Sequence, residues 1–402
     1  MPEMRGTTGF FAGICAIGAL AIFSSTMSKN PVLPLFAKFL GADGAQLGII
    51  AAASTIPGIL VSLPAGSLSD IYGRRRVMVL SLFVFASAPF LYLIVTAPWH
   101  LMLVRFYHGF ATAIFVPITN AIIAKRYPER KGERISLFSS MTLVGRSAAP
   151  FVGGFILLVS SYSSLYLVVG ASATLSLIVG LLLFRFSDGE TRDASESKPL
   201  CIVESLRAIT MNAKILVTSY VEATQYFTFG AFEFFLILYA DSIGLGILGI
   251  GAMSGTQLVA VGISKPIFGA LSDRIGRRSV IIGGLVLGAL SLFVVSGLTG
   301  LLPITSMGII YGLGFSAVTS ATVPFVSDLV GDESYGSAMG FISTIMDIGQ
   351  TMGPIVTGIM VAVFSFAPSF IFLGCVLVIS CVIFALATGL GRDRFDQRAV
   401  PP

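Results

Sequence analysis

Long apolar runs separated by short polar turns make up almost the whole chain. Twelve runs occur, each bounded by glycine, proline or charged residues. Because a helix needs about 20 apolar residues to cross a bilayer, the pattern predicts twelve transmembrane helices. We place them at residues 8–30, 45–68, 75–96, 99–123, 135–160, 163–185, 214–240, 246–271, 278–298, 303–328, 336–363 and 367–390.

One long hydrophilic segment interrupts this pattern after the sixth run. It predicts an N-terminal six-helix bundle over residues 1–186, a cytoplasmic linker over 187–211 and a C-terminal six-helix bundle over 212–402. The expected fold class is therefore an all-α membrane protein.

The composition agrees with a membrane protein and excludes several functions. Hydrophobic residues make up 55% of the chain and charged residues 11%, whereas soluble domains carry roughly 25% charged residues. The basic residues lie in turns and not on one soluble face, so we expect no nucleic-acid partner. The four cysteines form no CxxC pair, and no nucleophile–base group or phosphate-binding GxxxxGKS/T loop is present. We expect no enzyme activity, cofactor, metal site or ATP-driven transport.

Lysine and arginine placement predicts the orientation. With a cytoplasmic N-terminus, 20 of the 25 basic residues fall on the cytoplasmic side and only Lys29 and Lys38 on the outer side. Positive residues concentrate in cytoplasmic loops. The chain is therefore expected to be a multi-pass protein of the cell (inner or plasma) membrane with both termini in the cytoplasm.

A ten-residue pattern occurs once in each half. Residues 66–76 read GSLSDIYGRRR and residues 269–278 read GALSDRIGRR. An offset of 203 or 204 residues relates these segments and also many glycines and prolines elsewhere. Since six spans separate the copies, both bundles should have the same orientation. The candidate gating-loop residues are Gly66, Asp70, Gly73, Arg74, Gly269, Asp273, Gly276 and Arg277.

The chemistry of these loops suits a turn between two spans. The first glycine of each copy, Gly66 or Gly269, would allow close backbone approach, and the arginines supply fixed charge. We expect Asp70 and Arg74 to bridge the halves and hold an outward-open state. The alternative is that the arginines only determine topology.

The repeated pattern GxLSDxxGRR resembles the signature of the major facilitator superfamily. GRSAAPFVGG at 145–154 resembles the antiporter motif of its drug-efflux branch, with Ala149 in place of a glycine, and GQTMGPIVTG at 349–358 repeats it. PVLP at 31–34 resembles the twelve-helix drug–proton antiporters. The resemblance implies a substrate site between two bundles whose access alternates. Generic glycine packing is the alternative for the proposed helix-packing residues Gly145, Pro150, Gly154, Gly349, Gly353 and Pro354.

The fourth span contains RFYHG at 105–109, which resembles the RxxQG element of the superfamily with His108 in place of glutamine. In that family the equivalent arginine is associated with proton transfer, which would fall to Arg105 here. Pairing of Arg105 with backbone carbonyls is the alternative. His108 is a candidate for the substrate cavity, or else a packing residue.

The seventh span carries two carboxylates. Glu222 and Glu233 are eleven residues apart, which places them within about 20° of the same helix face at 100° per residue. Gln225, Tyr226 and Phe229 follow that stripe. A polar and aromatic stripe on an apolar helix predicts the wall of a water-lined substrate cavity, although either glutamate could instead lie at a helix end.

Two further charges fall near mid-membrane. Arg146 and Asp347 each lie about eleven residues into a span, where a bare charge costs roughly 2.5–3.5 kcal/mol. We expect attraction across a central cavity, with Glu222, Glu233 or Asp347 binding and releasing a proton as Arg105 or Arg146 moves. Lys265 could snorkel to the membrane surface.

These patterns favour a monomeric secondary transporter that exports amphiphilic or apolar small molecules in exchange for protons. Its expected partners are its substrate, protons and the lipid bilayer. The first span lacks the acidic residue that many drug–proton antiporters carry in the N-terminal half. The alternatives are a symporter or facilitator that imports a sugar or organic anion, and a membrane sensor that does not transport.

Overall fold

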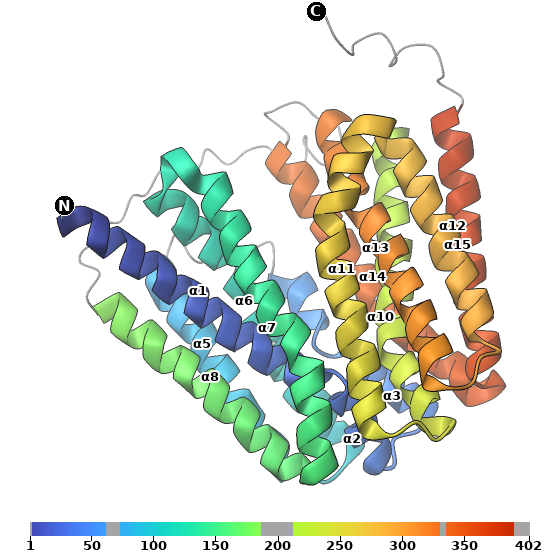
Figure 1. Cartoon of the computed structure of the whole chain (residues 1–402), viewed down its shortest axis with the longest axis horizontal. Coiled ribbons are helices and arrows are strands. Elements are labelled where there is room, and N and C mark those ends of the chain that lie inside the picture. The colour runs from blue at the N-terminus through green and yellow to red at the C-terminus, as the bar shows by residue number, and fades with distance from the viewer. Residues whose placement is uncertain (1, 62–72, 186–211, 330–334, 390–402) are drawn as a thin grey trace, which may run out of the picture.

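The computed structural model describes residues 2–61, 73–185, 212–329 and 335–389, and these are almost entirely helical (Figure 1). The linker expected at 187–211, as well as Gly66 and Asp70, lies outside the described residues. The described helices are α1 (Pro2–Lys29), α2 (Val32–Phe39), α3 (Gly44–Ala52), α5 (Arg74–Leu91), η1 (Tyr92–Ile94), α6 (Pro98–Arg126), η2 (Pro128–Arg130), α7 (Lys131–Val159), α8 (Tyr162–Arg185), α10 (Ala213–Ser242), α11 (Ile247–Ile275), α12 (Arg277–Val295), α13 (Leu301–Leu329), α14 (Tyr335–Phe364) and α15 (Phe366–Gly389).

The described residues contain 11 helices that are long and apolar enough to cross a membrane. The helix outside this set is α10, which has 30 residues but carries Glu222, Glu233 and several hydroxyl groups. The predicted seventh span is therefore a helix of sufficient length but of lower apolarity. The all-helical fold expected from the hydrophobic pattern is confirmed.

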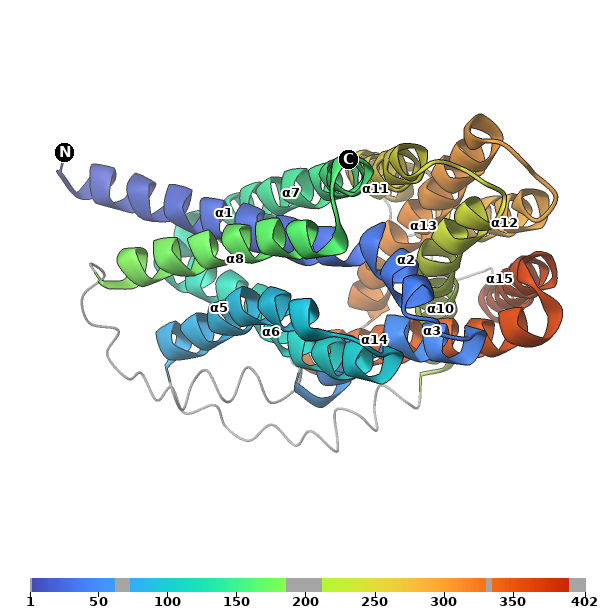
Figure 2. The ribbon, with the colours of Figure 1, turned by 90° about the horizontal axis from the view of Figure 1, so that it is seen from below.

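The helices form two bundles, α1–α8 and α10–α15 (Figures 1 and 2). The beginning of α1 and the end of α15 lie at one end of the molecule, which we call the terminal side, and α2 lies at the opposite end, the far side. Helix α7 packs against α11, and α3 packs against α14. These two helix pairs form the seam between the bundles.

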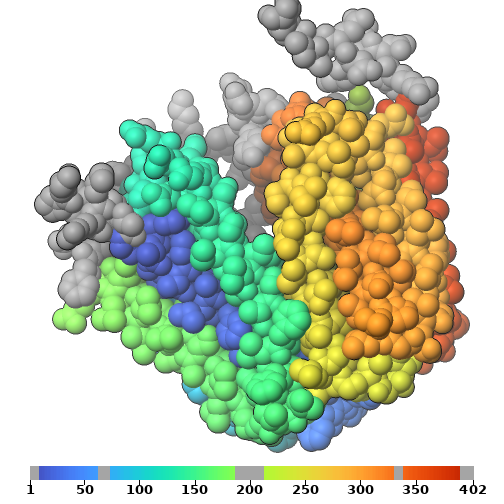
Figure 3. Space-filling model, viewed as in Figure 1, coloured from blue at the N-terminus to red at the C-terminus, as the bar shows by residue number. Residues whose placement is uncertain are grey.

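The bundles meet near the far side and separate toward the terminal side. In Figure 3 the surfaces of α7 and α11 touch in the lower part of the view and part above it, leaving a terminal-side crevice. One buried apolar cluster joins residues of both bundles, including Leu33 and Phe235, whereas a second, around Phe85 and Phe115, belongs to the N-terminal bundle alone.

The second predicted span is interrupted. Helix α3 ends at Ala52, turns occupy residues 53–55, and helical structure resumes at 56–61. Pro57 lacks a backbone N–H and cannot donate to the turn before it. The break exposes polar groups of Ser54 and Thr55 inside the protein, where other helices bind them.

Candidate functional site

A buried carboxylate lies in the C-terminal bundle. Glu222 on α10 is 1% exposed, and the Thr322 hydroxyl of α13 donates a hydrogen bond to its Oε2. Its Oε1 has no hydrogen-bond partner among the described residues. Lys265 on α11 is its charged neighbour. An incompletely satisfied buried carboxylate is costly and is therefore a candidate for proton binding.

Aromatic side chains form a wall beside Glu222. The Phe229 and Phe315 rings stack with centroids 4.1 Å apart, and the half-buried Tyr226 meets Phe315 edge-on at 5.2 Å. The Lys265 Nζ lies 5.7 Å from the Phe315 centroid, within cation–π range. The ammonium group of Lys265 therefore lies beside this wall.

Gln225 is more deeply buried than expected for a residue that lines a substrate cavity. Its side chain is fully buried, and neither amide atom has a hydrogen-bond partner among the described residues. Glu222, Gln225 and Phe229 all lie inside the C-terminal bundle, at most 8% exposed. Tyr226 is the residue of the stripe that is only half buried.

Arg146 and Asp347 come from the two seam helices. Arg146 on α7 is exposed and within electrostatic range of both Tyr226 and Lys265. Asp347 on α14 is half buried and interacts electrostatically with Tyr226. Its carboxylate lies against Gly58, where a Cβ would be 3.0 Å from Oδ2. Charges from both bundles thus gather around Tyr226.

The structure places Glu233 elsewhere. The Lys29 ammonium lies 2.7 Å from its Oε2, and the Asn30 amide donates to Oε1 at 2.6 Å. Both partners belong to the N-terminal bundle at the far side. Eleven residues of helix separate Glu233 from Glu222 by about 16 Å, so a shared helix face does not give them shared neighbours.

Arg105 and His108 lie inside the N-terminal bundle. Arg105 is 3% exposed and donates to the Ser54 hydroxyl at 2.5 Å. His108 is 1% exposed, and its Nδ1 lies 3.4 Å from the Tyr92 hydroxyl, whose ring stacks on Tyr166. Within the described ranges no carboxylate forms an ion pair with Arg105. The expected attraction across the cavity is therefore not seen for Arg105, and His108 does not line the crevice. The sequence assigns both residues to a position along a span but does not show which neighbouring helix they face.

The glycine-rich motifs lie at close helix contacts that repeat between the halves. Gly145 faces the carbonyl of Ala19 on α1, and Gly349 faces the carbonyl of Ala223 on α10. A Cβ on Gly353 would overlap the backbone of Phe227 on α10. Each of these contacts holds one bundle together.

Two other contacts of these motifs join the bundles. A Cβ on Gly251 would lie 2.7 Å from the Pro150 carbonyl and 3.0 Å from the Gly154 Cα. At the equivalent place in the other seam, Gly48 faces the Pro354 carbonyl. Only glycine permits such backbone approach, so the motifs define both the interiors of the bundles and the seam.

The family follows from comparison with known proteins. A family model described as Major Facilitator Superfamily matches residues 14–254 and 219–400. The chain belongs to the major facilitator superfamily. It is therefore a multi-pass membrane transporter.

Known superfamily members resemble the chain along most of its length. The quinolone resistance protein NorA of Staphylococcus aureus is 25% identical over 349 residues, 86% of this chain and 88% of NorA. Multidrug resistance protein 2 of Bacillus subtilis is 24% identical over 359 residues, 87% of this chain and 88% of that protein. An uncharacterized MFS-type transporter of Methanocaldococcus jannaschii is 23% identical over 342 residues, 84% of this chain and 87% of that protein.

Solved superfamily structures share the fold. The nucleoside transporter NupG superposes with a TM-score of 0.78 at 16% identity, covering 94% of this chain and 99% of NupG. A bacterial homolog of the human lysosomal transporter Spinster, inward-facing and occupied, gives 0.79 at 16% identity, covering 98% of this chain and 99% of that chain.

The superfamily loop signature has matching backbone geometry in both copies. Gly73 and Gly276 have φ values of 88° and 90° and precede α5 and α12. A side chain at such a φ is strained, which explains these two glycines. Gly269 differs from our expectation, because a Cβ there would meet no atom within 4 Å and no close approach exists.

Arg74 and Arg277 of this signature each have a partner within their own bundle. Arg277 pairs with Asp273 at 3.3 Å and with Asp328 at 2.5 Å, both in the C-terminal bundle. Arg74 donates to the Ala121 carbonyl at 3.1 Å. Asp70, expected to bridge the halves with Arg74, lies outside the described residues.

Among the described residues of this superfamily member, no group of three or more His, Cys, Asp or Glu side chains could hold a metal ion.

Proposed function

We propose that the chain exports amphiphilic or apolar small molecules in exchange for protons, by alternating access between its two bundles. The carrying observation is Glu222, buried with one oxygen unpartnered, beside Lys265 and the aromatic wall of Tyr226, Phe229 and Phe315. Stacked aromatic rings bind planar apolar groups. The names of two relatives, a quinolone resistance protein and a multidrug resistance protein, support the same substrate class.

The proposal assigns the terminal side to the cytoplasm, because the basic residues favour that orientation. The terminal-side crevice of Figure 3 is then open to the cytoplasm and the seam is closed to the outside. A substrate would enter from the cytoplasm or the inner leaflet and meet the aromatic wall at Tyr226, its half-buried member, behind which Phe229 and Phe315 are 8% and 3% exposed. In the opposite state, Asp70 and Arg74 would bridge from the N-terminal bundle to the C-terminal bundle on the cytoplasmic side.

Glu222 is the proposed proton carrier. Burial without an ion pair favours the neutral carboxyl group, and approach of a cation favours the ionised one. Lys265 lies in the same bundle as Glu222, whereas Arg146 lies on α7 of the other bundle, so movement of the bundles would change the distance of Arg146 from Glu222 and Lys265. Arg146 and Asp347, on α7 and α14, would undergo the same change across the crevice and adjust the charge balance there.

Proton coupling and substrate translocation can be measured separately. We would reconstitute Glu222→Gln, Asp347→Asn and the control Glu129→Gln, which alters an exposed carboxylate. Fluorescent planar dyes would be followed in gradient-driven transport and in counterflow without a gradient. Glu222→Gln should abolish gradient-driven transport and retain counterflow, while the control retains both. Intact gradient-driven transport in Glu222→Gln and Asp347→Asn would refute this mechanism.

A second candidate is import of an organic anion. The exposed cations Arg146 and Lys265 favour it, because both lie near the crevice and could bind a carboxylate. An imposed proton gradient would then drive an organic anion into the cell and not a dye out. A sensor that does not transport would show no counterflow with either class.

A further inference from the structure

Among the described residues, two ion pairs connect the bundles at the far side, and both join positions that are equivalent in the repeat to within one residue. Lys29 pairs with Glu233 at 2.7 Å, and Lys38 pairs with Asp241 at 2.5 Å. The paired residues are 204 and 203 positions apart, which is the offset that relates the two halves. The matching turn glycines Gly41 and Gly244 are 203 positions apart, so Lys38 contacts the counterpart of its own position and Lys29 contacts the residue next to its counterpart.

Such contacts have a geometric meaning. Positions related by a two-fold axis touch each other only where they lie close to that axis. Side chains that remain identical after duplication would place like charges together there and repel. In this chain the N-terminal copy carries lysines and the C-terminal copy carries carboxylates, so closure of the far side brings opposite charges together.

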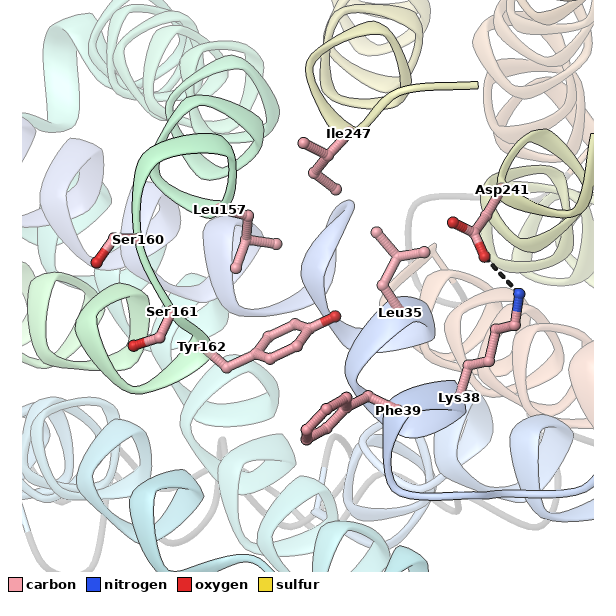
Figure 4. Close-up of a pocket in the computed structure, with 9 residues that line it drawn as sticks. All are labelled: Leu35, Lys38, Phe39, Leu157, Ser160, Ser161, Tyr162, Asp241 and Ile247. Carbon is pink, nitrogen blue, oxygen red and sulfur yellow. Dashed lines mark hydrogen bonds and ion pairs between the residues drawn. The ribbon is translucent and has the colours of Figure 1, made fainter. Parts of the chain in front are cut away.

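The two pairs differ in exposure. The Glu233 side chain is 9% exposed and Lys29 28%, and the Asn30 amide occupies the second carboxylate oxygen at 2.6 Å. Lys38 and Asp241 are 53% and 33% exposed. They lie at the edge of a far-side cavity of about 630 Å³ lined by both bundles, including Leu157 of α7 (Figure 4). Water therefore screens the Lys38–Asp241 pair far more than the Lys29–Glu233 pair.

We infer that Lys29 and Glu233 form the far-side latch, the ion pair that sets how strongly the state closed at the far side is favoured. This inference rests on the alternating access of the proposed function. Separation of the bundles would hydrate both charges. Removing one partner leaves the other charge, on the buried Glu233 or the half-buried Lys29, uncompensated only while the far side is closed. Replacing both with apolar side chains removes both charges and their desolvation cost together.

The latch therefore predicts an unusual pattern of variants. Glu233→Gln or Lys29→Met alone should raise the ratio of far-side-open to far-side-closed protein at least about tenfold. The double variant Lys29→Met/Glu233→Met should return to within about threefold of the unaltered protein. Lys38→Met, the control in the exposed pair, should change the ratio by less than about fivefold.

The measurement is the distance between spin labels on the two bundles in the full-length protein in lipid nanodiscs, without substrate or gradient. Ile94 and Leu302 are suitable label sites, at 71% and 78% exposed, after serine replaces the native cysteines. Thermal unfolding of each variant verifies that it is folded.

Unchanged distances in both single variants would overturn the latch, and so would a double variant as open as either single one. This distance result is independent of substrate and protons. Absence of dye transport by the unaltered protein would defeat the proposed function and leave the distance test of the latch decisive by itself.

Discussion

The seam between α7 and α11 provides a direct test of whether the far side opens. In Gly251→Ala the new Cβ would lie 2.7 Å from the Pro150 carbonyl oxygen of the other bundle. Ordinary contact begins at 3.4 Å, so the shortfall is 0.7 Å, the difference between 3.4 Å and 2.7 Å. The opposing atoms are backbone and cannot rotate away, so one helix has to move.

A matched control has the same overlap inside one bundle. In Gly314→Ala the Cβ would lie 2.7 Å from the Gly284 carbonyl oxygen, between α13 and α12. Overpacking of this kind costs about 1–3 kcal/mol. Both glycines lie within helices, so the gain in helix propensity is similar and cancels in the comparison.

The two substitutions should have different consequences because only one strains a contact that opening would break. Gly251→Ala should raise the open-to-closed ratio at the far side by about 5- to 150-fold, the equivalent of 1–3 kcal/mol. Gly314→Ala should lower the free energy of unfolding by about 1–3 kcal/mol and leave that ratio unchanged.

Label distances between Ile94 and Leu302 measure the ratio, and chemical denaturation in detergent measures the unfolding free energy. The reasoning fails if Gly251→Ala leaves the distances unchanged, or if Gly314→Ala shifts them by the same amount.

Three further predictions concern single sites. Gly276→Ala should destabilise the protein by about 1–3 kcal/mol because φ is 90° there. Gly269→Ala, inside α11 with open space around it, should instead stabilise the protein by up to about 1 kcal/mol. Thermal unfolding of both variants checks that the stability changes have opposite signs, and changes of the same sign contradict the argument. Arg105→Lys should cost about 1–3 kcal/mol of unfolding free energy, because an ammonium cannot reproduce the guanidinium geometry beside Ser54; an unchanged unfolding midpoint would show that this geometry is dispensable. Phe315→Leu should weaken dye binding by about two- to tenfold through loss of stacking, as measured by fluorescence titration. The control is Phe370→Leu, which alters a fully buried ring that packs against Phe232. It should leave the dissociation constant of the dye unaltered.

The repeat made much of the internal geometry predictable. A constant offset placed Gly145 and Gly349 in equivalent helices, and the structure gives each the carbonyl of an equivalent alanine, Ala19 and Ala223. Likewise, Gly73 and Gly276 share one backbone conformation. Duplicated segments fold alike because the same local pattern of glycine, proline and apolar residues recurs.

The neighbours of the charged residues were not predictable in this way. Arg105 and His108 lie within a predicted span, yet they turn into the N-terminal bundle, toward Ser54 and Tyr92. Lys29 served in the sequence analysis only as an indicator of orientation, so its ion pair with Glu233 was not predicted. Its separation of 204 residues from Glu233, within one residue of the repeat offset, was the signal that could have found the pair.

The sequence by itself therefore determined the helices, the duplication and the glycines on which close packing depends, because these follow from apolar run length and from local backbone geometry. Only the tertiary structure decided which charges are paired, which are buried and which face the crevice. Helical periodicity assigns a side chain to a face and a depth, but the identity of the opposing helix depends on how the two bundles pack.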